Sequence, residues 1–549
     1  MKSEIKSMIA PNSLNVMKHR RFYAYLEIAT YSLVAVITLW WLYSAITFAG
    51  SGGNTTLPVA FTLFIFAILL LSETIRNFII NFFRLVLRYK WVLFVAMLVW
   101  QLLTWSSFGN VTMGADQESI RRTANDPQVF SEYLSRCPNN VLITYIYWLV
   151  MQIVPDSWPA NSATLIMQLL GIVCLDASIA FTPHVLKRVS PRAANIAFFL
   201  FIGTFGLTGH IILVYTDLLT LPLTLGAMYC AVLILFPQKE GDDNYQSWRH
   251  WQCYILFAFF GILTYLGYQM KPSSIIITIA FVLVWIIVCW GKALLTKVLP
   301  ALLAFAIGMI GAGAAFNVAV DKQMQLNYDP SQSYPMSHFM AMGMRDRGGF
   351  SYEDRRDMDK YIGKDAKNER SIQLIKQRLR GYGPVKYLQF VLQKARYTLE
   401  DGSFSFGRED SLYIYKAQDD HGDLSGFQKT GVAGFMRSMY DGSRIRYEWV
   451  VLFQQIAYIV MIVGILVTSL MSLRSIKLRV VERCRSNNSE FISWWWAIAI
   501  LGSLAFLMLF ESGRAKYIIQ FMPFYICFAA IGWDVFLGKI KKNNNSLTD

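Results

Sequence analysis

Apolar stretches long enough to cross a bilayer recur along most of the chain. A helix needs about 17–25 mainly apolar residues to cover ~30 Å of hydrocarbon. We place the basic clusters MKHRR, RLVLRYK, HVLKRVSPR, GKALLTK, RSIKLRVVERCR and KIKK in the cytoplasm, because cytoplasmic loops carry excess Lys and Arg. This predicts an all-α polytopic membrane protein with roughly twelve transmembrane helices and both termini inside. The spans are 24–48, 57–75, 91–108, 162–184, 194–213, 218–236, 251–269, 273–291, 297–317, 448–472, 491–510 and 518–536.

One apolar segment does not fit this alternation. If NNVLITYIYWLVMQIVP, residues 139–155, crossed the membrane, every later loop would change sides. We therefore expect it to be a re-entrant or interfacial helix on the outer side.

A long polar insert interrupts the spans at residues 318–447. It divides the chain into three parts. The first is an N-terminal transmembrane module, 1–317, which contains an outer loop at 109–161. The insert follows, and C-terminal helices with a cytoplasmic tail make up 448–549. Helical patterning and aromatic residues predict a small mixed domain rather than a linker. Two amphipathic helices, NERSIQLIKQRLRGYGP and VKYLQFVLQKARYTL, either lie on the bilayer surface or cover a membrane groove.

Composition and charge add little to this picture. The chain has 549 residues, is 55% apolar and has a formal net charge of +15. Excess Lys and Arg is usual in polytopic chains, so the charge does not predict a nucleic-acid partner. The seven cysteines show no metal-ligand or disulfide spacing.

The predicted topology brings charged groups from distant loops to one face. Asp116, Asp217 in YTD, Lys271 and the segment ESGRAKY, Glu511–Tyr517, all fall on the outer side. We therefore predict one site at the level of the lipid headgroups, assembled from residues far apart in the chain.

Each of these residues also has a plain structural explanation. Asp116 is suited to act as a general base. By residue type alone, a solvated loop acid that pairs with Arg121 or Arg122 is the commoner role. Asp217 is placed to cap the helix that follows it, and Lys271 to extend toward the interface.

Other polar residues carry weaker signals. Asp176 lies inside a span, where a carboxylate is costly, and serves as a helix-packing partner or faces a polar cavity. His338 has a Gly-rich neighbourhood, but no second His or Cys lies at metal spacing. An ion pair between Glu511 and Arg514 or Lys516 would stabilise a helix junction.

Together these features resemble a known family. An outer-loop Asp after an N-terminal span, YLSRCPNN, YTD and ESGRAKYIIQFMP are similar to motifs of the GT-C superfamily of multi-pass glycosyltransferases. SHFMAMGMRDRGGFSYED (Ser337–Asp354) and KARYTLEDGSFSFGRE (Lys394–Glu409) resemble segments of Gram-positive members that decorate cell-wall polysaccharides or teichoic acids. Two departures are Cys137, where the family has Tyr, and RAKY, where many relatives have SRY.

The resemblance implies a function and a set of site residues. It implies transfer of a sugar from a polyprenyl-phosphate donor to a hydroxyl of an extracytoplasmic cell-wall glycopolymer, with inversion and with Asp116 as general base. Lys271, Arg514, Lys516 and Tyr517 would bind the donor phosphate. No cofactor is firmly implied, and a divalent cation remains open. The residues expected to bind or orient substrates are Arg121, Tyr133, Arg136, Asn139, Asp217, His338, Lys394, Asp401, Glu409 and Glu511.

Rival functions remain open at this point. A lipid or saccharide transporter or flippase would show related halves and binding residues near the midplane, and the sequence shows no internal repeat. An O-antigen-type polymerase would use a lipid-diphosphate oligosaccharide instead. A non-catalytic scaffold for wall assembly would not depend on the outer-face acids.

Overall fold

The computed structural model describes most of the chain. The described residues are 16–48, 78, 81, 85, 88–109, 115–155, 157–159, 161–236, 250–289, 294–327, 329–406, 426–482 and 488–545. Within these ranges the structure consists of helices, turns and loops, with no strand.

The described helices confirm an all-α polytopic membrane protein. Nine are long and apolar enough to span a membrane, and two shorter apolar helices accompany them within the described part of the chain. The long ones lie in α2 (Val16–Ile46), α5 (Lys90–Phe108), α10 (Ser162–Leu186), α12 (Thr216–Leu235), α13 (His250–Met270), α15 (Leu299–Gln323), α21 (Ile445–Glu482), α22 (Asn488–Leu509) and α23 (Met522–Asn545).

The two shorter helices complete the set of predicted spans that the structure describes. They are α11 (Pro191–Phe205), which is followed by η2 (Gly209–Ile212), and α14 (Ile276–Val288), which is preceded by η3 (Pro272–Ile275). Eleven of the twelve predicted spans therefore coincide with observed helices. The twelfth, 57–75, lies outside the described residues.

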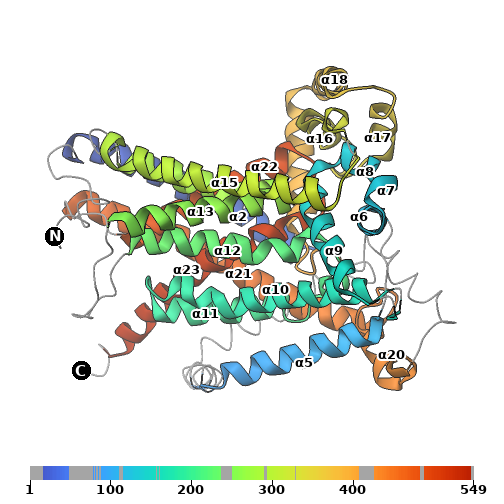
Figure 1. The fold of residues 1–549 in the computed structure, drawn as a ribbon. Helices are drawn as coiled ribbons and strands as arrows, with labels where there is room; N and C mark the ends of the chain where they lie inside the picture. The colour runs from blue at the N-terminus through green and yellow to red at the C-terminus, as the bar shows by residue number, and fades with distance from the viewer. Residues whose placement is uncertain are drawn as a thin grey trace.

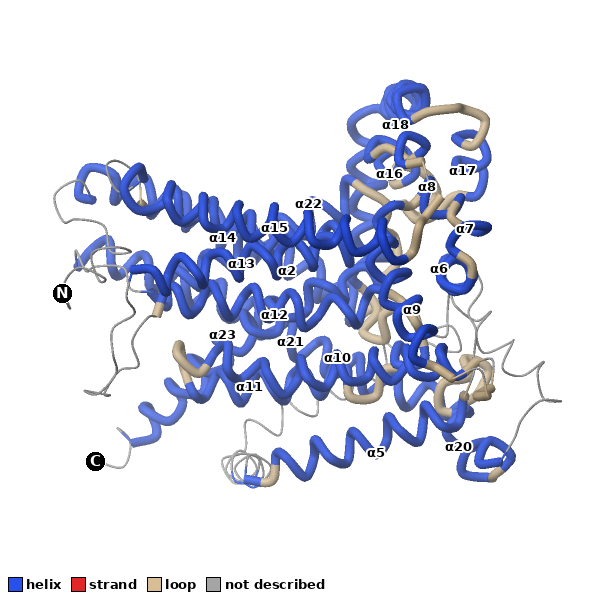
Figure 2. The backbone as a smooth tube through the Cα atoms, viewed as in Figure 1, coloured by secondary structure: helices blue, strands red, loops and turns tan. Residues whose placement is uncertain are grey.

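The spans run side by side (Figures 1 and 2). They pack around a core of aliphatic and aromatic side chains. Helices α11, α12, α21, α22 and α23 supply most of the fully buried side chains, among them Phe201, Tyr458 and Trp495. Several hydrogen bonds between buried polar groups join different helices of the bundle. For example, Trp41 donates to the Tyr458 hydroxyl at 2.8 Å, and that hydroxyl donates to the Leu399 carbonyl at 3.1 Å.

The short helices and the long, interrupted α18 gather at the end of the bundle opposite both chain termini (Figure 1). These are α6 (Ala115–Asn125), α7 (Pro127–Phe130), α8 (Glu132–Arg136), α9 (Val141–Ile153), α16 (Met336–Met342), α17 (Tyr352–Met358), α18 (Lys364–Leu399) and α20 (Gly431–Ser438). Because α5 ends and α10 begins at this end, the segment between them, including α9, returns without crossing the bundle.

The opposite end of the bundle carries basic residues next to the C-terminal helix. Ser190, in the turn between α10 and α11, donates to Asp534 of α23. In the same region Lys90 donates to Asn195 at 3.0 Å, and Arg188 donates to the carbonyl of Phe236. The α10–α11 turn, the start of α5 and the end of α12 therefore meet beside the C-terminal helix.

The described part of the insert is helical and does not show the mixed structure expected for it. Its two predicted amphipathic helices form one element, α18, which is interrupted at Gly383 (φ 64°, ψ 172°). A positive φ favours glycine, and the following Pro384 disfavours a helical conformation at Gly383. The break at Gly383 lies inside the motif GYGP, residues 381–384.

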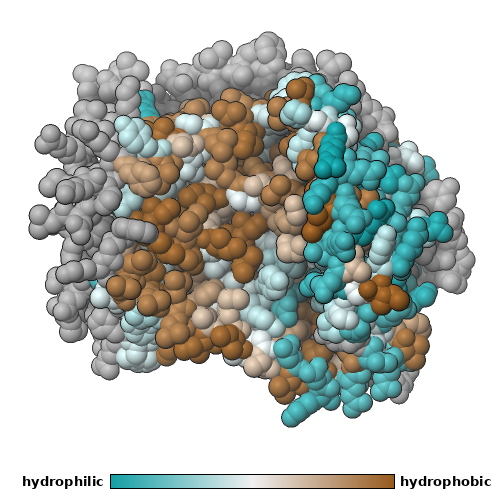
Figure 3. Space-filling view, turned by 90° about the horizontal axis from the view of Figure 1, so that it is seen from above, coloured by the Kyte–Doolittle hydropathy of each residue, from teal (hydrophilic) through white to brown (hydrophobic). Residues whose placement is uncertain are grey.

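The polar end and the apolar belt are distinct in a space-filling view (Figure 3). Apolar residues cover the spans, whereas hydrophilic residues concentrate at the end that holds the short helices. This boundary separates the part of the molecule that contacts lipid from the part that contacts water.

Candidate functional site

Asp116 lies at the polar end, in the first turn of α6, and is exposed to solvent. The hydroxyl of Tyr215 donates to Asp116 Oδ2 at 3.3 Å. Tyr215 takes an extended conformation (φ −146°, ψ 175°) directly before α12, which brings its ring back toward α6. A carboxylate in the first turn is also favoured by the helix dipole.

A second tyrosine flanks the same carboxylate. The side-chain amide of Asn140 donates to the Tyr133 hydroxyl at 2.6 Å. Burial raises the pKa of Tyr133 well above its usual value, and the charge of Asp116 together with a hydrogen bond to it adds to this effect. Burial followed by the charge of Asp116 likewise raises the pKa of Tyr215. Both phenols therefore remain protonated and can donate to the acid.

The two arginines after Asp116 pair with a different acid. Arg121 Nε and Nη2 donate to Glu118 at 2.9 and 2.8 Å, and Arg122 Nε donates to it at 2.7 Å. The hydrogen bond from Arg121 is the main cause that lowers the pKa of Glu118 to about 2. The i,i+3 and i,i+4 spacings account for this pairing.

Cations from distant segments surround Tyr517. Lys271 Nζ and Lys516 Nζ each lie 5.9 Å from the centre of the Tyr517 ring. Lys271 also forms a buried ion pair with Asp217, so Asp217 neutralises Lys271 and does not cap its own helix. Pro272 holds Lys271 extended after the end of α13, which directs its side chain into this region.

Glu511 connects the cations to Asp116. The Tyr517 hydroxyl donates to Glu511 Oε1 at 2.5 Å. Burial raises the pKa of Glu511 and the charge of Asp116 adds to the rise, while Tyr517, Arg514 and Lys516 oppose it. Electrostatic coupling thus reaches from residue 116 to residues 511–517. We call the residues around these contacts the Asp116 cluster: Asp116, Tyr133, Tyr215, Asp217, Lys271, Glu511, Arg514, Lys516 and Tyr517.

Lys394 lies in a different setting from the Asp116 cluster. Its ammonium is buried and donates to the backbone carbonyls of Gly343 at 2.8 Å, Met508 at 3.0 Å and Phe510 at 2.6 Å. The last two acceptors are carbonyls at the end of α22, which the helix leaves without partners. Two of the three donors of Lys394 therefore hold backbone just before Glu511, and the third binds the insert at Gly343.

Glycines let the insert approach this segment closely. The amide of Ser512 donates to the Gly348 carbonyl at 2.7 Å, and the amide of Gly513 donates to Thr398 Oγ1 at 3.1 Å. A Cβ on Gly513 (φ 68°) would lie 2.2 Å from the Arg347 carbonyl oxygen. We call the segments 343–349, 394–405 and 508–515 the insert junction.

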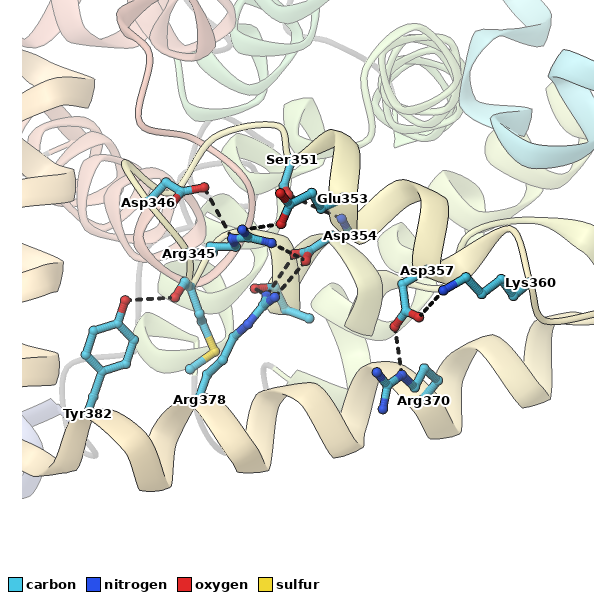
Figure 4. Close-up of polar contacts among 12 residues, drawn as sticks. Arg345, Asp346, Ser351, Glu353, Asp354, Asp357, Lys360, Arg370, Arg378 and Tyr382 are labelled. Carbon is cyan, nitrogen blue, oxygen red and sulfur yellow. Dashed lines mark hydrogen bonds and ion pairs between the residues drawn. The ribbon is translucent and has the colours of Figure 1, made fainter.

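Ion pairs secure the insert side of this junction (Figure 4). Arg378 of α18 donates to both oxygens of Asp354, at 2.8 and 2.7 Å, and Arg345 pairs with Glu353 and Asp354. The Tyr382 hydroxyl donates to the Met344 carbonyl at 3.2 Å. The motif MGMRDRGGF is therefore fixed to α18 on one side and to α22 on the other.

Asp401 also shapes backbone. It accepts hydrogen bonds from the amides of Ser403 at 2.8 Å and Ser405 at 2.9 Å, and Ser405 Oγ accepts from the Ala515 amide at 3.1 Å. Phe404 and Ser405 have positive φ values of 57° and 64°, which this network holds in place. Asp401 thus acts on the site indirectly, through the segment that precedes Lys516.

Three further residues that were predicted to bind or orient substrates contact side chains outside the Asp116 cluster. His338 is buried against Tyr334, with ring centres 4.8 Å apart, and burial lowers its pKa to about 4. Arg136 pairs with Glu132 at 3.0 Å and with Asp359 at 3.7 Å. Asn139 donates to Asn140 at 3.3 Å.

Two residues complete the comparison with the sequence. Glu409 lies outside the described residues. Asp176 accepts from the Gln101 amide at 3.0 Å in the amide orientation that satisfies both side chains, so it joins α10 to α5 as a helix-packing partner.

Sequence reasoning gave no role to two residues of this region. Tyr215 is the first residue of the motif YTD. Its position two residues before Asp217 was the sequence feature that could have identified it. The charge of Asp116 also contributes, after burial, to raising the pKa of Cys137 to about 12, so the residue that departs from the family pattern lies near the acid. Among the described residues no group of three or more His, Cys, Asp and Glu is arranged to hold a metal ion.

The helices, the apolar belt and the polar end define a polytopic α-helical integral membrane protein. The chain belongs to the family described as a conserved hypothetical integral membrane protein, whose model matches residues 13–536. No curated protein and no solved structure matches the chain.

Proposed function

We propose that the protein is a GT-C-type glycosyltransferase that moves a sugar from a polyprenyl-phosphate donor to a hydroxyl of an extracytoplasmic cell-wall glycopolymer. The observation that carries the proposal is the Asp116 cluster. An exposed carboxylate, two tyrosines and several cations come together at the ends of spans that lie up to four hundred residues apart. A lipid-linked donor and a water-borne acceptor meet at that level.

Asp116 is the proposed base. The acceptor hydroxyl donates to its carboxylate, which takes the proton as the oxygen attacks the anomeric carbon from the side opposite the phosphate. The bond between the anomeric carbon and the phosphate oxygen breaks, and its electron pair leaves with the polyprenyl phosphate. One displacement inverts the anomeric configuration. A positioned base typically contributes ~10²–10⁴-fold.

The cations would stabilise the leaving phosphate. Lys271, Arg514 and Lys516 supply the positive charge that a phosphate would meet, and Asp217 offsets part of it by pairing with Lys271. The raised pKa of Glu511 supports this, because a carboxyl group that holds its proton longer repels a phosphate less. Preorganised donors of this kind often contribute the larger part of catalysis.

The distribution of charge supports an extracytoplasmic site. The end opposite the Asp116 cluster holds Lys90, Arg188 and the C-terminal helix. Since cytoplasmic loops are enriched in Lys and Arg, this end fits the cytoplasm, and the cluster then faces outward.

The test is donor cleavage by the purified protein in vesicles. We expect release of polyprenyl monophosphate and transfer of the sugar from a polyprenyl-phosphate donor. Cleavage of only a lipid-diphosphate oligosaccharide would indicate a polymerase. Movement of the intact lipid across the bilayer without cleavage would indicate a flippase, and either result would contradict the proposal. Cell-wall polymers compared with and without the protein would then identify sugar and acceptor.

A further inference from the structure

The second half of α18, residues 384–399, has two unlike faces. Phe390, Lys394 and Thr398, spaced four residues apart, are 9%, 1% and 0% exposed. Val385, Leu388 and Leu392, by contrast, are 68%, 60% and 41% exposed. At 100° per residue, the exposed trio falls on the side of the helix opposite Phe390. This is an amphipathic helix whose outer stripe is apolar.

The buried face is held by the insert junction. Lys394 donates to Gly343 on the insert side, and a Cβ on Gly348 would lie 2.5 Å from Lys394 Cδ. The protein therefore occupies the side of the helix that carries Lys394. The apolar stripe points away from the insert.

The position of the helix coincides with the ends of the spans. Helix α18 contacts α2, α22 and η7 (Ala515–Phe521). Lys394 binds carbonyls at the last turn of α22, and the Leu399 carbonyl accepts from Tyr458 of α21. In Figures 1 and 2 this half of α18 runs across the direction of the spans, at the border between the bundle and the polar end. A helix so placed is parallel to the bilayer plane at headgroup level.

Exposed apolar side chains near the ends of two spans that contact α18 indicate the surroundings of the stripe. Leu509 at the end of α22 is 49% exposed and Tyr43 near the end of α2 is 51% exposed, so the apolar outer surface of the spans reaches this level. Lys386 in this half of α18 is exposed, as are Lys376 and Arg380 before the break at Gly383. Their ammonium and guanidinium groups suit lipid phosphates.

We propose that residues 384–399 form an interfacial helix whose Val385, Leu388 and Leu392 enter the boundary between the headgroups and acyl chains of the adjacent leaflet. Of the two positions that the sequence left open for this helix, the proposal favours the bilayer surface over a cover for a membrane groove. It goes beyond the proposed function and does not depend on it.

The arrangement has a mechanical consequence. Lys394 projects from this same helix and holds the backbone of Phe510, the residue before Glu511. The depth of the helix in the leaflet is therefore coupled to the position of the segment that carries Glu511 and Arg514. A change in lipid packing on this side would act on that segment without contacting it.

The test measures whether lipid or water contacts each face of the helix 384–399. A fluorescent non-canonical amino acid is placed at Leu388, and in a matched variant at Gln393, which is exposed and lies about 140° around the helix. The full-length protein is reconstituted in phosphatidylglycerol-containing vesicles. Quenching is measured with brominated phospholipid and with iodide.

We expect the ratio of lipid quenching to iodide quenching to exceed one at Leu388 and to fall below one at Gln393. Stronger iodide quenching at Leu388 would show that the stripe faces water. Protection of Leu388 from both quenchers would show that protein covers it. Either result overturns the proposal, and Val385 provides a second probe position if the Leu388 variant fails to fold.

Discussion

The Asp116 cluster and the insert junction lie side by side and share Glu511 and Arg514, yet they use polar groups in opposite ways. In the cluster, Asp116 is exposed, and Lys271, Glu511, Lys516 and Tyr517 are half-buried. In the junction, Lys394 and Asp401 are 1% and 3% exposed, and their polar atoms bind backbone. The first region leaves polar groups accessible to a ligand. In the second region the polar groups form hydrogen bonds with the backbone and hold it in place.

This difference separates two roles that the family resemblance had combined. In the proposed function, Asp116, Lys516 and Arg514 would contact substrates. Lys394 and Asp401 bind backbone and would position the segment that carries the cations. Substitutions in the two regions should therefore affect different measurements.

The largest effect is expected for Asp116→Asn. The amide cannot accept the proton of the acceptor hydroxyl, so turnover should fall by ~10²–10⁴-fold, about 3–5 kcal/mol, with unchanged thermal stability. Sugar transfer by the purified variant measures this. Glu118→Gln, on the same helix, is the control and should retain turnover. Wild-type turnover in Asp116→Asn would contradict the assignment of the base.

Breaking the buried ion pair should come next. Asp217→Asn leaves the Lys271 ammonium without its counter-charge, which costs about 3–5 kcal/mol of stability. Thermal unfolding of the reconstituted protein measures the loss, and Asp217→Asn combined with Lys271→Met should recover much of it. Glu132→Gln removes a pair whose acid is 81% exposed and should cost less than about 1 kcal/mol.

Lys394→Met tests the junction directly. Three backbone carbonyls would lose their donor, so we expect a loss of about 3 kcal/mol in the free energy of unfolding. Lys386→Met, on the exposed side of the same helix, should stay within about 0.5 kcal/mol of wild type. Equal stability of the two variants would remove the distinction between the regions.

His338 should make the insert sensitive to acid. Burial lowers its pKa from 6.5 to about 4, so between these values the unfolded chain binds a proton that the folded chain does not. Stability should therefore fall as the pH drops, by up to about 1.4 kcal/mol per pH unit in this range. His338→Phe should flatten this dependence in thermal unfolding measured from pH 4.5 to 7. An unchanged slope would mean that other groups cause it.

The smallest effect is expected for Tyr215→Phe. The hydrogen bond to Asp116 is long, at 3.3 Å, and its loss should cost about 1 kcal/mol, roughly a fivefold decrease in turnover. Tyr352→Phe, a 61% exposed residue of the insert, is the control. A decrease as large as that of Asp116→Asn would show that Tyr215 does more than orient the acid.

Much of the fold was predictable because membrane spans are local. A run such as 218–236 meets the length and hydropathy requirement by itself, and α12 follows at Thr216–Leu235. The break in α18 was also visible in GYGP. The pairing of Arg121 and Arg122 with Glu118 rather than Asp116 was missed, although helical spacing favours it.

The amino-acid sequence alone determined the described membrane-spanning helices, since these depend on length and hydropathy. It also placed Asp116, Lys271 and Arg514 on one face. Only the tertiary structure decided which acid meets which cation, because those contacts depend on how helices rotate and pack. That is why Asp217 proved to neutralise Lys271, and why the three donors of Lys394 all bind carbonyls.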